Sequence, residues 1–325
     1  MADVVEKFRN ESVNGIPISV LKSAVQKYAR RGLLEDGLCV LGLLSFFTEP
    51  RITTNVTNRL VVCMSEEVNI HEIYLPVMMM ELHRKYVADR DPSVWLEMYT
   101  LLCRSRKCRL VSDAKTRWNL PPYKAKLPRL DQLHRVLLEK NGIPFCDDDR
   151  EQSTAVADLG TALREHDWDG TFNVLRRLLR QAHAPRGMEK DIWGVIASAA
   201  EMRDERLVPV VGALRYFHGK LKHAERPIYM YHAILLIRHA PSLDYASQMD
   251  ATVPESLEHW RRQGSRLTLK SFPGFVIDRH TTLARGESSV VFAEVGAWIP
   301  NEDKRFLNEE HRRLYHAFKV LQENV

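Results

Sequence analysis

Apolar residues recur at helical spacing along most of the chain, and few stretches alternate between apolar and polar positions. This pattern predicts a mainly α-helical fold. Gly32 is expected to close the first helix, and Asp91-Pro92 to begin a later one, since an acidic cap precedes a proline in the first turn. In the first part of the chain the predicted helices span residues 18–30, 33–47, 55–68, 71–88, 92–105 and 107–117.

The second part of the chain repeats this helical texture after a proline-rich extended stretch, "WNLPPYKAKLP". A helix over 129–142 and a linker, "IPFCDDDREQ", come first. Helical patterns resume at 152–165, 169–183, 189–202, 205–221, 227–239 and 254–263. Beyond residue 265, β-branched runs broken by glycine and proline predict short extended segments or a hairpin, followed by a final helix that Asn301 caps.

The two parts match each other when one is shifted by 135 residues, without a gap over roughly 70 positions. His83 then falls on His218, and Pro92 falls on Pro227. Amphipathic helices of similar length also match by chance, but the ungapped register through three helices and their loops favours a tandem duplication. The predicted fold is therefore two helical bundles of about five helices each. The predicted boundaries are 1–146 for the first copy, 147–264 for the second and 265–325 for a C-terminal extension.

Three motifs of the first copy occur in a characteristic order: "VLKSAVQKYARRGLLEDGLCVLGLL", "TNRLVVCMSEEVNI" and "LLCRSRKCRLVSDAKTRW". The most specific piece holds Arg59, Leu60, Ser65 and Glu66. In this order the chain resembles the helical, collar-like C-terminal region of the RarA/MgsA replication-associated AAA+ ATPases, relatives of clamp loaders. The resemblance covers residues 17–118 and, more faintly, 155–245. It implies a tetramer-forming scaffold beside DNA and replication proteins.

The chain departs from that family in one important respect, because no G-x-x-x-x-G-K-[ST] phosphate loop is present. The nearest stretch, "GALRYFHGKL", has six residues between its glycines and no hydroxyl residue after Lys220. ATP hydrolysis is therefore not expected. A separate ATPase subunit is an expected partner, and a virus or mobile element is a natural home for such a stripped and duplicated module.

Charge is distributed unevenly along the chain. The net charge is +5, yet residues 103–129 hold nine Lys and Arg against Asp113 alone, a net +8, so the remainder sums to −3. Cations that neutralise phosphates, interleaved with aromatic rings that stack on bases, are typical of nucleic-acid binding. An acidic protein partner and an ordinary solvated surface are the alternatives. No helix-turn-helix or zinc-finger signature predicts sequence-specific reading.

The predicted nucleic-acid contacts fall into three groups along the chain. The basic segment contributes Arg104, Arg106, Lys107, Arg109, Lys115, Arg117, Trp118, Tyr123, Lys124, Lys126 and Arg129. Lys220 and Lys222 lie in the second copy, and Arg261 and Arg262 flank its end. Two copies can thus present two binding sites to one duplex.

Catalytic chemistry has one candidate region, "IDRHTTLARGE". There, Asp278, His280 and Glu287, followed by Glu294, Glu302 and Asp303, suit a divalent ion for phosphodiester cleavage, although such loops more often supply turns and caps. Cys103 and Cys108 lack a second pair at zinc-ligand spacing. We therefore expect no catalytic residue, metal or cofactor, and keep a metal-dependent nuclease as the lesser alternative.

Five cysteines without regular spacing indicate a reducing compartment. The N-terminus lacks a signal-peptide pattern, and the longest apolar run, "LCVLGLLSFF", is too short to span a membrane. We expect a soluble intracellular protein, nuclear in a eukaryotic or viral-host setting and otherwise cytoplasmic. The working hypothesis is a non-catalytic DNA-binding accessory or architectural protein in replication, recombination or packaging, which can form a homo-oligomer and can bind replication proteins. The alternative is an interaction scaffold for an acidic protein.

Overall fold

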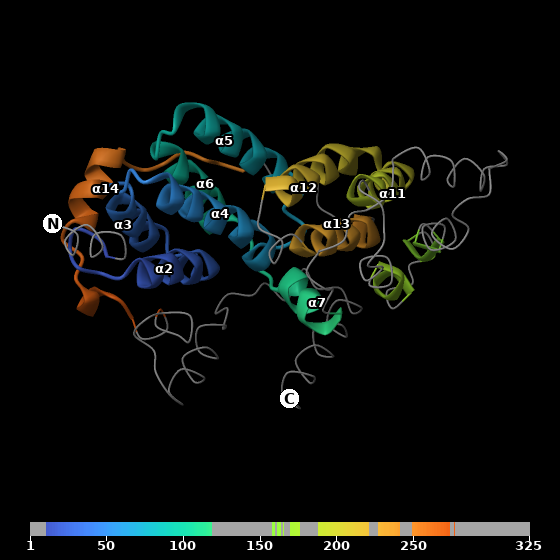
Figure 1. Ribbon diagram of the computed structural model, residues 1–325, viewed down its shortest axis with the longest axis horizontal. Helices are drawn as coiled ribbons and strands as arrows, with labels where there is room; N and C mark the ends of the chain where they lie inside the picture. Colours follow the sequence, from blue (N-terminus) through green and yellow to red (C-terminus); the bar gives the residue numbers. More distant parts are fainter. Residues whose placement is uncertain are drawn as a thin grey trace. The chain divides into compact units, whose positions relative to one another are not determined.

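A computed structural model describes residues 11–118, 158–159, 161–163, 165, 170–175, 188–220, 227–240, 249–273 and 276. Within these residues the protein is mainly α-helical, which confirms the predicted class (Figure 1). The same residues contain no sheet. They hold two isolated β-bridges, Glu11 with Pro17 and Val68 with Lys107. The predicted helix at 129–142, the C-terminal extended segments and the final helix lie outside the described residues.

The described residues divide into two compact units. The first combines residues 11–109 with the late segment 249–276, and the second lies between them in the chain. The first unit contains α2 (Ile18–Arg31), α3 (Leu34–Leu44), α4 (Pro50–Glu67), α5 (Leu75–Asp89), α6 (Ser93–Arg104), α14 (Leu257–Gly264) and the 3-10 turn η3 (Leu269–Ser271). The second contains α7 (Leu110–Trp118), α11 (Met188–Arg203), the 3-10 turn η1 (Glu205–Leu207), α12 (Val208–Lys220) and α13 (Pro227–His239).

The core of the first unit lies between α2, α3, α4 and α6, which contact one another. Trp95 of α6 is buried, and its indole N–H donates to Thr57 Oγ1 of α4 at 2.9 Å. Tyr99, one turn further along α6, covers Gly37 of α3, where a Cβ would lie only 1.9 Å from the tyrosine oxygen. As predicted, Gly32 ends α2, in a left-handed conformation with φ 66°.

The late segment 249–276 packs onto the first unit through α14, which lies along α3 (Figure 1). Two glycines permit this contact at backbone distance. A Cβ on Gly42 would lie 2.2 Å from the carbonyl oxygen of Trp260, and one on Gly264 would lie 2.4 Å from that of Cys39. The predicted second copy, 147–264, includes this helix, whereas in the structure it belongs to the first unit because its apolar face is buried on α3.

The second unit is organised around α13, which contacts α7, α11 and α12. Every side chain of α13 is buried except that of Arg238, which is half-buried. Tyr231 of α13 stacks on Phe172 with ring centroids 5.0 Å apart, and Trp193 of α11 meets the ring of His218 edge-on at 5.4 Å. A helix that is apolar on all faces is expected at the centre of a bundle.

Candidate nucleic-acid interface

The basic segment 103–129 is only partly described. Arg104, Arg106, Lys107 and Arg109 belong to the first unit, and Lys115 lies on α7 of the second. Arg117 and Trp118 end α7, but their side chains lie outside the described part. So do Tyr123, Lys124, Lys126 and Arg129, together with Lys222 of the second basic set. The geometry therefore bears on the first five cations of the segment.

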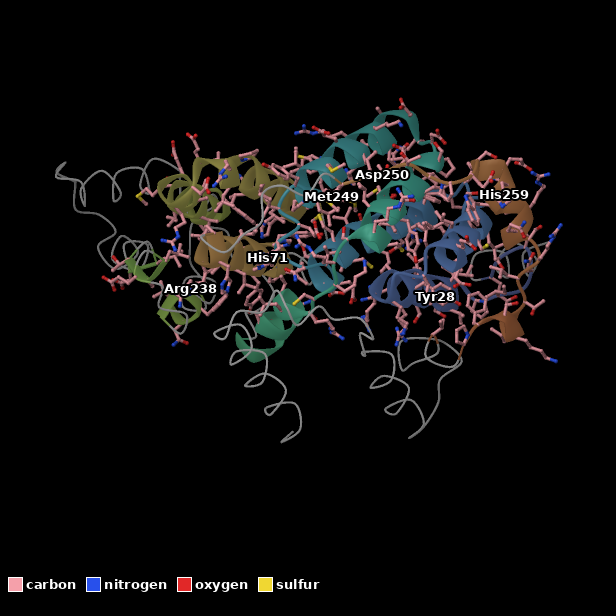
Figure 2. The ribbon with its side chains drawn as sticks, turned by 180° about the vertical axis from the view of Figure 1, so that it is seen from behind. Tyr28, His71, Arg238, Met249, Asp250 and His259 are labelled. Atoms are coloured by element: carbon pink, nitrogen blue, oxygen red, sulfur yellow. The ribbon has the colours of Figure 1, made fainter. Side chains whose placement is uncertain are left out.

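Two of these cations bind acidic groups of the protein itself. Arg106 donates from Nε to Glu72 Oε1 at 2.6 Å, and its backbone N–H reaches the same oxygen at 3.1 Å. Arg104 forms an ion pair with the carboxylate of Asp250 and donates to the backbone oxygen of Asp250 at 3.1 Å. Figure 2 labels Asp250 on the late segment that returns to the first unit. These contacts hold residues 104–106 against the elbow between α4 and α5 and against the returning chain.

Lys107 is buried, with its ammonium group donating to the carbonyl oxygen of Leu102. Burial lowers the pKa of Lys107 to about 8, although the nearby Cys103 and Glu67 favour its charged form. Its backbone pairs with Val68 in the isolated β-bridge, and the N–H of Cys108 donates to the oxygen of Glu67 at 3.2 Å. In this position the Lys107 ammonium is out of reach of a phosphate outside the protein.

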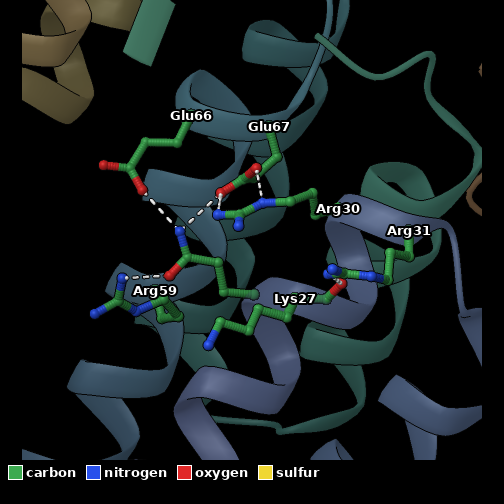
Figure 3. A network of polar contacts seen from close by, with 7 residues as sticks. Lys27, Arg30, Arg31, Arg59, Glu66 and Glu67 are labelled. Carbon is green, nitrogen blue, oxygen red and sulfur yellow. Dashed lines mark hydrogen bonds and ion pairs between the residues drawn. The ribbon is translucent and has the colours of Figure 1, made fainter. Parts of the chain in front are cut away.

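A buried polar network lies next to this bridge, between α2 and α4 (Figure 3). Arg30 binds Glu67 with two hydrogen bonds of 2.6 Å, from Nε to Oε2 and from Nη2 to Oε1, and the two side chains are 6 % and 1 % exposed. Gln26 donates from Nε2 to Glu67 at 2.7 Å and to Glu66 at 2.9 Å, and its oxygen accepts from Arg59 at 3.0 Å. Two acids and two arginines are thus linked through one amide.

The electrostatics of the network follow from this geometry. Burial alone would raise the pKa of Glu67, but the charge and hydrogen bonds of Arg30, the charge of Arg109 and the amide of Gln26 lower it to about 2. Arg109 is therefore electrostatically coupled to a carboxylate inside the first unit. Arg59 and Glu66, which the family resemblance singled out, belong to this network, whereas Leu60 and Ser65 are buried beside it. No motif or charge pattern indicated Gln26, Arg30 or Glu67 as members of a network.

The remaining predicted contacts differ in their exposure. Lys220 is exposed and lies over the ring of Tyr216, 5.4 Å from its centroid. Arg261 is half-buried: Nε donates to Ser45 Oγ at 2.9 Å, and the guanidinium lies over Phe46 at 5.6 Å. Arg262 is exposed. The two adjacent arginines of α14 thus have different environments, because one docks on α3 and the other faces solvent.

Other chemistry has little support among the described residues. They contain no cluster of three His, Cys, Asp or Glu side chains that could hold a metal ion. Cys63, Cys103 and Cys108 are buried free thiols, and Cys39 is half-buried. The candidate nuclease residues from Asp278 to Asp303 lie outside the described part. None of the helices described there combines the length and apolar character needed to cross a bilayer.

Comparison with protein-family models, with characterised proteins and with solved structures gives no match to this chain.

Proposed function

We propose that the protein is a non-catalytic DNA-binding factor with an accessory or architectural role in replication, recombination or packaging. The observation that carries the proposal is the charge of the part of the basic segment that follows Arg109. Residues 110–129 still hold five cations, Lys115, Arg117, Lys124, Lys126 and Arg129, against Asp113 alone. A net +4 over twenty residues suits binding to a phosphate backbone. Solvation of a surface alone does not require one sign of charge, because mixed charges would serve it equally well.

The segment is also well placed in the chain for such a role. It begins on α7, whose residues Leu110, Val111 and Ala114 are buried in the second unit. This apolar side anchors the helix. Lys115, which follows Ala114, is half-buried, so part of its aliphatic side chain is packed. The other four cations follow it in the sequence. Trp118 and Tyr123 supply aromatic rings between those cations for stacking on exposed bases.

A tandem duplication of a collar-like bundle belongs to the same proposal. Helices α4, α5 and α6 contact one another in the first unit, and α11, α12 and α13 do so in the second. The shift of 135 residues carries α6, Ser93–Arg104, onto 228–239, which is α13 but for its first residue. It also carries the buried His83 onto the buried His218. The same order, the same mutual contacts and a shared buried histidine support descent of these two sets of three helices from one ancestral bundle.

The resemblance to the RarA/MgsA collar adds two expectations to the proposal. A collar of this kind self-associates, so a homo-oligomer is expected, and it works next to an ATPase, so a separate ATPase subunit is an expected partner. Both can be examined by size-exclusion chromatography with light scattering, alone and with candidate partners.

The test is binding of labelled duplex, single-stranded and forked DNA by a variant with Lys115, Lys124, Lys126 and Arg117 each replaced by Glu. We expect binding to be lost while the helical circular dichroism is unchanged. The matched control replaces four exposed cations elsewhere, Arg51, Lys85, Arg90 and Arg203, by Glu. It makes the same change in net charge, so it should weaken binding far less.

Two outcomes would redirect the proposal. If the segment variant keeps the affinity of the wild type for DNA, the basic segment does not bind the DNA phosphates. If the wild type binds no DNA at low salt, the cations serve an acidic protein partner instead. A parallel reaction with Mg²⁺ tests the nuclease alternative, because cutting that is lost in Asp278→Ala would replace a binding role by a catalytic one.

A further inference from the structure

The end of α14 and the turn after it carry three basic residues of the first unit, Arg262, Arg266 and Lys270, which we call the basic ridge. All three side chains are exposed, and none forms an ion pair within the described part of the chain. Residues 261–270 contain four cations and no acid. The acids nearest in the sequence, Glu255 and Glu258, precede this stretch, and they lie 3.9 Å from His259 and Arg261 respectively.

Unusually many contacts hold the backbone of this ridge in place. Asn14 Nδ2 donates to three carbonyl oxygens at and just after the end of α14, those of Gly264 at 3.2 Å, Ser265 at 3.0 Å and Leu267 at 2.9 Å. The turn that carries Lys270 is closed by Thr268 and Ser271, since the N–H of Thr268 donates to Ser271 Oγ at 3.0 Å and the N–H of Ser271 donates back to the oxygen of Thr268 at 2.9 Å.

Both flanks of the ridge are anchored in the first unit. On one side, Gly42 and Gly264 bring α3 and α14 into backbone contact, and Arg261 docks on Ser45 and Phe46. On the other side, Val276 is fully buried, and its carbonyl oxygen accepts from Ser23 Oγ at 2.6 Å and from Lys27 Nζ at 3.2 Å. An eight-residue helix would not keep this conformation alone, so its order comes from these contacts.

Helix stability alone does not account for the ridge. Cations in the last turn of a helix are favourable near its negative end, which explains Arg261 and Arg262. That effect fades within one turn, whereas Arg266 and Lys270 follow the end of α14 at Gly264. Three exposed cations on an anchored backbone, without an ion pair among the described residues, instead suit a regularly charged, rigid anion.

We infer that the 262–270 ridge is a second DNA site, which contacts the sugar-phosphate backbone of duplex DNA and does not stack on bases. Trp260, the aromatic residue of α14, is buried at 5 % exposure, so its ring is not presented beside the cations. The inference rests on the proposed function, because it takes DNA as the anion. It differs in place, since the ridge belongs to the first unit, whereas α7, where the other basic segment begins, belongs to the second.

The experiment measures the salt dependence of binding to a fluorescent duplex by the full-length protein. The ridge variant carries Arg262→Gln, Arg266→Gln and Lys270→Gln. The matched control carries Arg51→Gln, Lys85→Gln and Arg90→Gln, three exposed cations on α4, on α5 and at the end of α5. The slope of log K against log salt is negative, and each lost phosphate contact reduces its magnitude by about 0.9. The slope of the ridge variant should therefore be smaller in magnitude than that of the wild type by about 2.7.

When salt rises from 50 to 200 mM, the affinity of the wild type for the duplex should fall by a factor about 40 times larger than that of the ridge variant. The control should keep the slope of the wild type, and thermal unfolding should show that both variants fold. A ridge variant with an unchanged slope would overturn the inference while leaving the proposed function standing. A wild type that binds no duplex would overturn the inference, and one that binds no duplex, single-stranded or forked DNA would overturn the proposed function as well.

Discussion

Removing the charge of Glu67 provides a sharp test of the buried network. In Glu67→Gln the Arg30 guanidinium stays buried without a counter-charge, although a neutral amide still occupies the site. Breaking a buried ion pair on one side costs about 3–5 kcal/mol, because an uncompensated charge remains in the protein interior. The lowered pKa gives a similar value. A change from 4.5 to about 2 favours the ionised form in the folded state by about 3 kcal/mol.

The sign of the pH dependence follows from the same pKa. The pKa of Glu67 is lower in the folded state, so its stabilisation is fully present above pH 4.5 and is lost as the pH falls toward 2. The difference in unfolding free energy between the wild type and Glu67→Gln should therefore shrink by about 2 kcal/mol between pH 7 and pH 3. Urea denaturation followed by circular dichroism at the two pH values measures both quantities.

A double variant separates the ion pair from simple loss of packing. Arg30→Met with Glu67→Met replaces both charges by apolar side chains, and such replacements of buried ion pairs are often neutral or stabilising. The double variant should thus be more stable than either single variant. The reasoning is refuted if Glu67→Gln costs less than about 1 kcal/mol at pH 7, or if its cost does not depend on pH.

Three further predictions concern packing and buried titratable groups. Gly42→Ala should destabilise the protein by about 1–3 kcal/mol and make Arg262 and Arg266 more accessible to trypsin, because a Cβ would collide with the Trp260 carbonyl. Gly212→Ala, where space is open, should stabilise the protein through α12 by about 0.5–1 kcal/mol. Equal melting temperatures of the two variants would contradict this. Lys107→Met should leave DNA affinity unchanged and not lower the melting temperature, because burial lowers the pKa of Lys107 to about 8 and disfavours its charge; a loss of binding would show that this lysine reaches DNA. Burial lowers the pKa of His232 to about 3, so the unfolded chain gains a proton below its usual pKa of 6.5 and stability should fall by about 1.4 kcal/mol per pH unit below that value; His232→Gln should flatten this dependence in acid melts.

Much of the fold could be predicted from the sequence, because helical periodicity and end signals are local. The predicted helices at 92–105 and 227–239 correspond closely to α6, Ser93–Arg104, and α13, Pro227–His239. The docking of α14 on α3 could not be predicted. It depends on Gly42 and Gly264, which are far apart in the sequence and look like ordinary helical glycines until the two backbones meet.

In the candidate site, the sequence predicts where basic residues are concentrated but not which of them are paired within the protein. Composition reveals that residues 103–129 are basic, but it does not reveal which cations have partners elsewhere in the chain. Arg106 pairs with Glu72, and Arg104 pairs with Asp250, whereas the exposed Arg266 and Lys270 belong to residues 261–270, whose net charge is only half that of residues 103–129. Gln26, Arg30 and Glu67 are polar residues at helical positions, and only the packing of α2 against α4 places them together in the interior.

The most direct test of DNA binding through phosphates is the salt dependence of the affinity of the wild-type protein for a duplex. Five cations in residues 110–129 and three on the ridge give eight possible contacts, so the slope of log K against log salt should be about −7. A slope near that value, reduced separately by the segment variant and by the ridge variant, is the predicted result. Absence of duplex binding at 50 mM salt, or an affinity that does not change with salt, would contradict the account.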